Sequence, residues 1–127
     1  MQDRVKYEYA IIRIVPKVER EEFFNVGVIL FSKRKKFLRV KFHICKKKLA
    51  TFSCEIDFDT LNNYLKAWED ICIGSPKGGT IGELELSDRF RWLTAPRSTI
   101  IQSSETHSGL CIEPEKELQY IFDSFVL

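Results

Sequence analysis

The sequence predicts an α+β domain in which helices cover a mainly antiparallel sheet of about five strands, in two layers. Three patterns predict this class: strand-like alternation near the N-terminus, helical periodicity in the middle, and two short apolar segments before a last amphipathic helix. The expected element order is β-β-β-α-α-β-β-α. Strands joined by short turns pair as antiparallel neighbours, and amphipathic helices then bury the apolar surface of the sheet.

Three strands are expected in the N-terminal third. Residues 5–15 alternate with two largely apolar faces, as in a central strand, and Pro16 is expected to end it because proline has no backbone donor. Residues 23–32 are apolar and β-branched, and Gly27 among them indicates a bulge or a close backbone approach. Residues 37–44 alternate again after a polar turn, which predicts a hairpin with one solvated face.

The clearest helical periodicity runs through residues 61–72. Asp57 or Asp59 can cap the start of this helix, and it should end before Gly74. A loop of small residues follows at 75–79.

The C-terminal part is expected to hold four short elements. A helix capped by Ser87 or Asp88 should end before Pro96, and two strands are expected at residues 99–103 and 109–112. A final helix begins at Glu113-Pro114, because proline is favoured in the first turn of a helix.

Length and composition indicate a single domain spanning residues 1–127. A hydrophobic content of 44% and an aromatic content of 13%, with ten phenylalanines, are those of a packed globular core. The net charge of +2 makes global attraction to nucleic acid weak.

The cysteines and the absence of targeting signals favour a cytoplasmic protein with free thiols. The four cysteines at positions 45, 54, 72 and 111 form no Cys-x-x-Cys pair. No apolar run is long enough to span a bilayer, and the N-terminus has no signal-peptide pattern, so we expect no contact with membranes.

Residues 89–111 concentrate hydrogen-bonding side chains around a few apolar anchors. Because a helix ends and a strand begins there, a guanidinium and two hydroxyls would emerge at one element boundary, which suits a phosphate or carboxylate. The predicted anion site consists of Arg89, Arg91, Arg97, Ser98, Thr99, Gln102 and His107.

A structural role for this stretch is the competing interpretation. Arg97 could pair internally with Glu19, Glu22 or Glu105 and fix the loop, since buried charges are usually paired. Asn25 could bond a neighbouring loop, or it could line the Arg97 site.

A basic hairpin is the strongest nucleic-acid feature. Residues 33–48 contain nine lysines or arginines and no acid, so a β-ribbon could follow phosphates. The candidate contacts are Lys33, Arg34, Lys35, Lys36, Arg39 and Lys41. Lysines also protect exposed strand edges, and a solvated face is the alternative explanation.

The sequence gives little support for a metal, cofactor or catalytic site. His43 with Cys45, and His107 with Cys111, lack the tight spacing of zinc ligands. Cys111 precedes a predicted helix and could form a nucleophilic pair with His107, but no third group or oxyanion donor can be identified, and a core cysteine is the favoured interpretation. We therefore expect no metal, no cofactor and no assigned catalytic residue.

Two blocks of the sequence resemble a known bacterial family. One is Tyr-Ala-Ile-Ile-Arg-Ile-Val-Pro through Asn-Val-Gly-Val-Ile-Leu-Phe at residues 9–31; the other combines Ala-Pro-Arg-Ser-Thr-Ile-Ile-Gln within residues 89–102 with His-Ser-Gly-Leu-Cys at 107–111. They resemble the signatures of domain-of-unknown-function family 3037 over nearly the whole chain. The resemblance implies a cytoplasmic bacterial domain without an established activity, often encoded beside a HipA-like kinase.

Three functions follow from these observations. The first is a non-enzymatic accessory domain that binds another protein, for which the resemblance implies a HipA-like kinase as the partner. The alternative is a nucleic-acid-binding module that uses the hairpin at residues 33–48. The third is a small enzyme, or a binder of a phosphorylated or acidic ligand, between Arg97 and His107.

Overall fold

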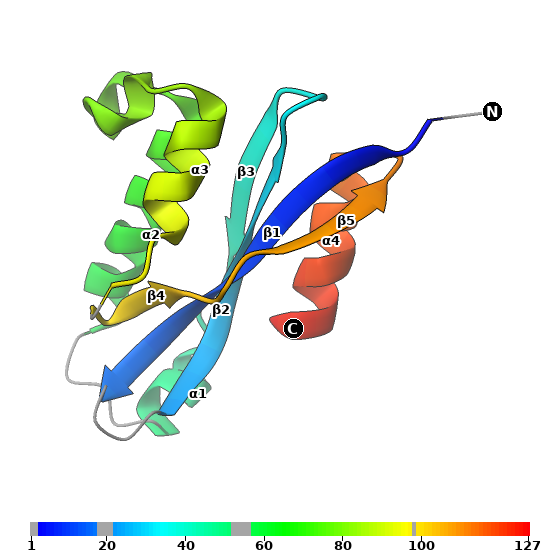
Figure 1. The fold of residues 1–127 in the computed structure, drawn as a ribbon. Helices are drawn as coiled ribbons and strands as arrows, with labels where there is room; N and C mark the ends of the chain where they lie inside the picture. The colour runs from blue at the N-terminus through cyan, green and yellow to red at the C-terminus, as the bar shows by residue number, and fades with distance from the viewer. Residues whose placement is uncertain (1–2, 18–21, 52–56, 98) are drawn as a thin grey trace.

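An open five-stranded antiparallel sheet with helices on both faces forms the fold (Figure 1). The computed structural model describes residues 3–17, 22–51, 57–97 and 99–127. The strands are β1 (Val5–Lys17), β2 (Glu22–Ser32), β3 (Phe37–Phe42), β4 (Ile101–Ser103) and β5 (His107–Cys111). The α-helices are α1 (Lys46–Thr51), α2 (Phe58–Ile73), α3 (Leu86–Thr94) and α4 (Pro114–Phe125), with short 3-10 turns η2 (Pro76–Gly78) and η3 (Ile81–Glu83). The predicted α+β class and antiparallel sheet are confirmed.

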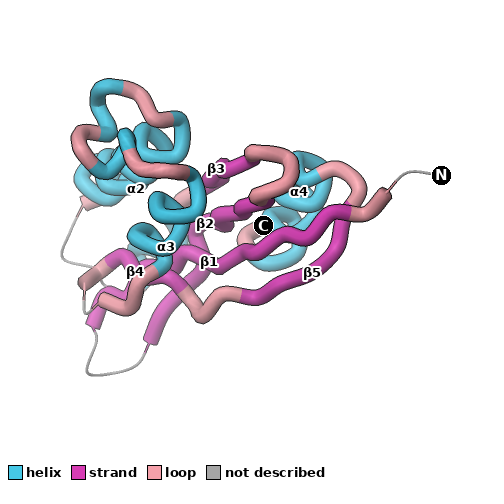
Figure 2. The backbone as a smooth tube through the Cα atoms, turned by 45° about the horizontal axis from the view of Figure 1, so that its top comes forward, coloured by secondary structure: helices cyan, strands magenta, loops and turns pink. Residues whose placement is uncertain are grey.

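β1 is the centre of the sheet. One edge of β1 pairs with β2, and β3 follows on the far side of β2. The other edge of β1 is shared, because β5 pairs with its first half and β4 with its second half. Figure 2 shows the two short strands one after the other along this edge. Residues near both ends of the chain are thereby placed on neighbouring strands.

From the sequence, β1 was expected to end at Pro16 and β2 to be irregular at Gly27, and only the second expectation is correct. β1 continues through Pro16 to Lys17, so the expected end at Pro16 is wrong. The pairing with β2 shifts register there, and a proline at such an irregularity breaks no regular ladder bond. At Gly27 the expectation is confirmed: the partners jump from Ile12–Gly27 to Arg13–Asn25, which leaves a bulge in β2.

The larger core lies between the sheet and the pair α2 and α3. Alternate residues of β1, such as Ile12 and Ile14, point to this side together with Val26 and Ile29 of β2. From α2, Leu61, Leu65 and Trp68 pack onto them, and α3 adds Phe90 and Leu93.

A second core lies on the opposite face under α4. It contains Val5, Tyr7 and Ile11 of β1, Val28 and Leu30 of β2, and Leu118, Ile121 and Phe122 of α4. The sheet is therefore covered on both sides, and the expected two layers become three because both faces of β1 and β2 are apolar.

The helix ends follow ordinary capping chemistry. Asp57 is the N-cap of α2, where its side chain accepts a 2.8 Å hydrogen bond from the backbone N–H of Thr60. Gly74 ends α2 with φ of 77°, the left-handed conformation that favours glycine. None of the helices in the described ranges is long and apolar enough to cross a membrane.

Candidate functional site

The three arginines of the predicted anion site lie in three different environments. Arg89, on α3, is a structural residue that binds the end of α2. Its Nε donates to the carbonyl of Leu84 at 2.8 Å, and one terminal nitrogen donates to the carbonyls of Ile71 and Cys72 at 3.1 Å each. A guanidinium used in this way holds the start of α3 against the end of α2.

Arg91 is paired with an acid on β1. Its two terminal nitrogens donate to the two carboxylate oxygens of Glu8 at 2.6 and 2.8 Å. This bidentate pair raises the pKa of Arg91 through hydrogen bonding to Glu8. Arg91 is therefore a fixed cation whose charge is balanced locally.

Arg97 lies flat on an aromatic ring. Its guanidinium carbon is 4.2 Å from the centroid of the Trp92 ring, and a terminal nitrogen donates to the Trp92 carbonyl. Partial burial lowers the pKa of Arg97, although a guanidinium remains charged near neutral pH. No ion pair of Arg97 is found among residues 3–17, 22–51, 57–97 and 99–127, a range that includes Glu22 and Glu105. Glu19 and Ser98 lie outside the described residues.

The Trp92–Arg97 pair forms one wall of an apolar groove of about 580 Å³. α2 provides the opposite wall through Tyr64, Ala67, Trp68 and Ile71, and residues 99–101 close the end. Tyr64 is 49% exposed and Trp92 is 42% exposed, so two large aromatic residues face solvent in this groove. We call this surface the α2–α3 groove.

Gln102 and His107 face the other side of the sheet. Gln102 is the cross-strand partner of Arg13, and His107 is the partner of Tyr9, whose ring centroid lies 5.3 Å from that of the imidazole. Since Ile101 belongs to the core under α2, its neighbour Gln102 points toward the α4 side. The predicted anion site is thus divided between two faces, and Thr99 merely bonds the Ile101 carbonyl at 2.7 Å.

A row of polar side chains crosses the sheet on the α4 side. Arg13 lies between Asn25 on β2 and Gln102 on β4, and its guanidinium carbon is 4.2 Å from the centroid of the Phe23 ring. Asn25 donates to the Phe125 carbonyl at 3.0 Å, so it fixes the end of α4 and does not line the α2–α3 groove. Arg13 was not predicted as a site residue, because it belongs to an otherwise apolar strand.

The basic hairpin is exposed at its turn and contacts α4 along β3, where Arg39 stays exposed. Residues 33–36 form the solvent-facing turn. Along β3, however, Arg39 pairs with Glu115 at 2.6 Å, and Lys41 donates to Gln119 and lies 5.2 Å from the ring centroid of Phe122. The face that was expected to be solvated therefore contacts α4, and an interface with nucleic acid would have to compete with these contacts.

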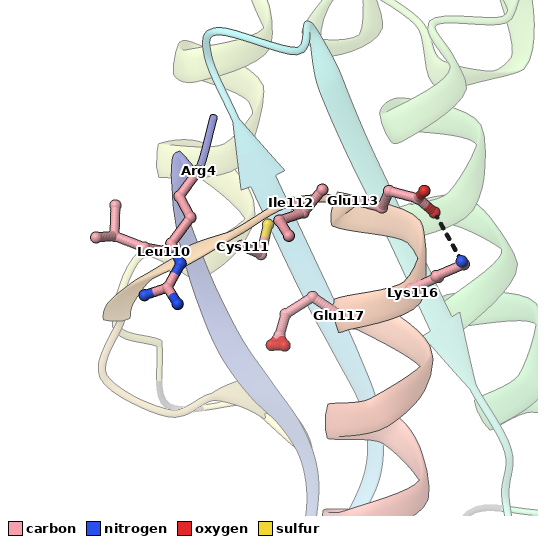
Figure 3. A pocket seen from close by; sticks show the side chains of 7 residues that line it. All are labelled: Arg4, Leu110, Cys111, Ile112, Glu113, Lys116 and Glu117. Atoms are coloured by element: carbon pink, nitrogen blue, oxygen red, sulfur yellow. Dashed lines mark ion pairs between the residues drawn. The ribbon is translucent and has the colours of Figure 1, made fainter. Parts of the chain in front are cut away.

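The cysteines of the described chain differ in environment. Cys111 and Glu117 line a hollow of about 570 Å³ between β5 and α4. Figure 3 shows both side chains in this hollow. Burial, followed by the charge of Glu117, raises the pKa of Cys111, and burial raises that of Cys72 to about 12. Conversely, backbone N–H groups at the start of α1 lower the pKa of Cys45. Cys54 lies outside the described residues.

His107 and Cys111 do not form a catalytic pair. They lie four residues apart on β5, which separates their Cα atoms by about 13 Å in an extended strand. Raised thiol pKa values also disfavour the nucleophilic thiolate. Within the described part of the chain, no three histidine, cysteine or acidic side chains are grouped closely enough to hold a metal ion.

The fold and its surfaces define a small α+β domain with a half-exposed aromatic groove. The comparisons place it in a family: the model for "Protein of unknown function (DUF3037)" matches residues 9–126, so the chain belongs to that family. No curated protein and no solved structure matches significantly. The predicted resemblance is confirmed over nearly the whole chain.

Proposed function

We propose that this protein is a non-enzymatic interaction module that binds a segment of another protein in the α2–α3 groove. The observation that carries the proposal is the half-exposed pair Tyr64 and Trp92, with the partly buried Arg97, around an apolar floor. Tyrosine, tryptophan and arginine are the residue types that contribute most binding energy at protein interfaces.

The groove also specifies the chemistry of its partner. Its floor of Trp68, Ile71 and Ile101 suits one apolar anchor side chain. Arg97 at the rim is a cation without an acidic partner within the described ranges, and it is held in place by Trp92. A partner segment with an apolar anchor next to a carboxylate or phosphorylated residue would fill the apolar floor and pair with Arg97.

The family resemblance supplies a first partner to test. A HipA-like kinase is the partner that it implies, and we propose that the α2–α3 groove binds such a kinase or a segment of it. We do not propose that a partner binds all three arginines of the predicted anion site. Arg89 and Arg91 are already bound by the α2 carbonyls and by Glu8, respectively.

Affinity purification with matched variants tests the proposal. Tagged wild-type protein, Tyr64→Ala/Arg97→Glu and the control Tyr120→Ala/Arg4→Glu are each purified from cells that naturally produce the protein, in parallel with and without nuclease treatment. The control makes the same chemical changes at exposed positions elsewhere. Loss of two interface anchors should weaken binding by about thirtyfold or more.

We expect one stoichiometric protein with wild type and control, and its loss with the groove variant. Circular dichroism verifies that each variant is folded, and Tyr64→Ala alone provides a milder second variant. Equal recovery of the protein with both double variants would show that it binds elsewhere. Recovery of nucleic acid alone would support the hairpin at residues 33–48 instead.

A further inference from the structure

A third concavity, of about 740 Å³, lies on the α3 side of the sheet. It is bordered by the first turns of α3, by the start of β1 and by the turn between β2 and β3, which contribute Ser87, Lys6 and Lys33 respectively. None of its lining residues belongs to the α2–α3 groove. We call it the basic cleft.

Charge is the feature that sets this cleft apart. Four basic residues line it: Lys6, Lys33, Arg34 and Arg91. Glu8 is the one acid among its described lining residues, and both of its carboxylate oxygens are bound by Arg91. The lining therefore carries a net charge of +3, from four cations and one anion.

The three remaining cations make no ion pair with any acid in the described part of the chain. Lys6, Lys33 and Arg34 are exposed, and no ion pair joins any of them to another residue in the described ranges. They come from two separate elements, β1 and the turn after β2, so they surround the cleft rather than follow one strand edge. A multivalent anion could contact all three together.

The start of α3 adds hydrogen-bond donors to the same cleft. Glu85 is the N-cap residue of α3, so the expected cap at Ser87 or Asp88 is wrong, and the Glu85 side chain makes no capping hydrogen bond to the first N–H groups of the helix. Ser87 lies in this first turn and lines the cleft. Asp88 is also in that turn but does not line the cleft. The N-terminal end of a helix favours an anion.

The floor of the cleft is apolar. Phe31 is buried there and stacks on Phe90 of α3, with ring centroids 5.4 Å apart. A volume of about 740 Å³ is in the range that holds a small molecule. We propose that the basic cleft binds a small molecule carrying at least two linked phosphate groups, with its phosphates on Lys6, Lys33 and Arg34.

Calorimetric titration with inorganic triphosphate and with ATP tests this at low ionic strength. Lys33→Glu/Arg34→Glu reverses two cleft charges, and Lys66→Glu/Lys77→Glu reverses two exposed charges outside the cleft. Because a hydrogen bond to a charged group is worth more than a neutral one, the cleft variant should bind at least about tenfold more weakly than wild type. The control should bind within about twofold of wild type, and added salt should weaken the wild-type affinity.

Three results would overturn the proposal. The first is the absence of binding by both probes to wild-type protein at low ionic strength. The second is an equal loss of affinity in the cleft variant and in its charge-matched control. The third is binding of a single-stranded oligonucleotide without binding of either small probe, which would assign the cations to an extended phosphate backbone.

Discussion

Arg89 and Arg91 show how two arginines in one helix differ in what they stabilise. Arg89 satisfies three backbone carbonyls at the junction of α2 and α3. Arg91 makes an ion pair with Glu8 near solvent, where its side chain is 54% exposed. Two of these hydrogen bonds are partly buried, and partly buried carbonyls that lose their donor cost more than a screened surface pair does.

We therefore predict that Arg89→Ala lowers the free energy of unfolding by about 2–3 kcal/mol. Arg91→Ala, which removes the same charge, should lower it by about 1 kcal/mol or less. Urea unfolding followed by circular dichroism measures both values. Equal losses in the two variants would contradict the structural role assigned to Arg89.

Gly27 is a position where the fold has no room for a side chain. A Cβ atom added there would lie 2.7 Å from the backbone carbonyl oxygen of Lys41 on β3. We predict that Gly27→Ala lowers the free energy of unfolding by about 1–3 kcal/mol, because strand backbones cannot move apart cheaply. Gly82→Ala is the control, since its Cβ would meet ordinary contacts starting at 3.6 Å. Unchanged stability of Gly27→Ala would show that β3 can shift.

Among the secondary-structure elements, α1 gives one cysteine a distinct reactivity. Backbone N–H groups of Lys48 and Lys47 lower the pKa of Cys45, whereas burial raises the pKa values of Cys72 and Cys111. A cysteine with a lowered pKa forms the reactive thiolate at lower pH, whereas a cysteine with a raised pKa forms it only at higher pH.

Alkylation should consequently modify Cys45 before Cys72 and Cys111. We predict that the rate of iodoacetamide labelling at Cys45 rises at a lower pH than that of a free cysteine. Mass spectrometry of digested protein, taken at several times and pH values, measures each site separately. Labelling of Cys72 as rapid as that of Cys45 would contradict the burial and pKa direction described for these thiols.

The regular elements were predictable because their patterns are local. Alternation in residues 37–42 and periodicity in residues 61–72 each record which side of an element is buried. α1 was not predicted, since its Lys-Lys-Lys-Leu-Ala-Thr sequence offers one buried residue, Leu49, and no repeating face. β5 begins at His107, earlier than expected, because pairing with Tyr9 continues the strand before Gly109.

For the molecule as a whole, the arrangement of the layers and of the site depended on long-range pairing. The periodicity of the last helix shows that one face is buried, but not which side of the sheet buries it. Likewise, the closeness of Arg97 and Gln102 in sequence suggested one site, whereas strand alternation sends Gln102 to the α4 side next to Arg13. The Arg97–Trp92 contact arises from the turn at Pro96 and could not be read from spacing alone.

Because β1 and β2 contribute to both cores, we predict that the two faces unfold together. Trp68 and Trp92 both lie on the α2–α3 side, so tryptophan fluorescence reports that face. Leu118→Ala removes a buried side chain on the opposite face and should cost about 2–4 kcal/mol. It should shift the fluorescence and circular dichroism transitions equally. A shift in the circular dichroism alone would reveal two independent units.

The most direct test of the interaction function is photo-crosslinking from the α2–α3 groove. A photoreactive phenylalanine analogue replaces Tyr64 in one sample and Tyr120, on α4, in another; both residues are exposed. We expect irradiation in cells to attach one protein at position 64 but not at position 120, and Arg97→Glu to abolish that adduct. The same adduct from both positions, or none from position 64, would contradict a docking role for the groove.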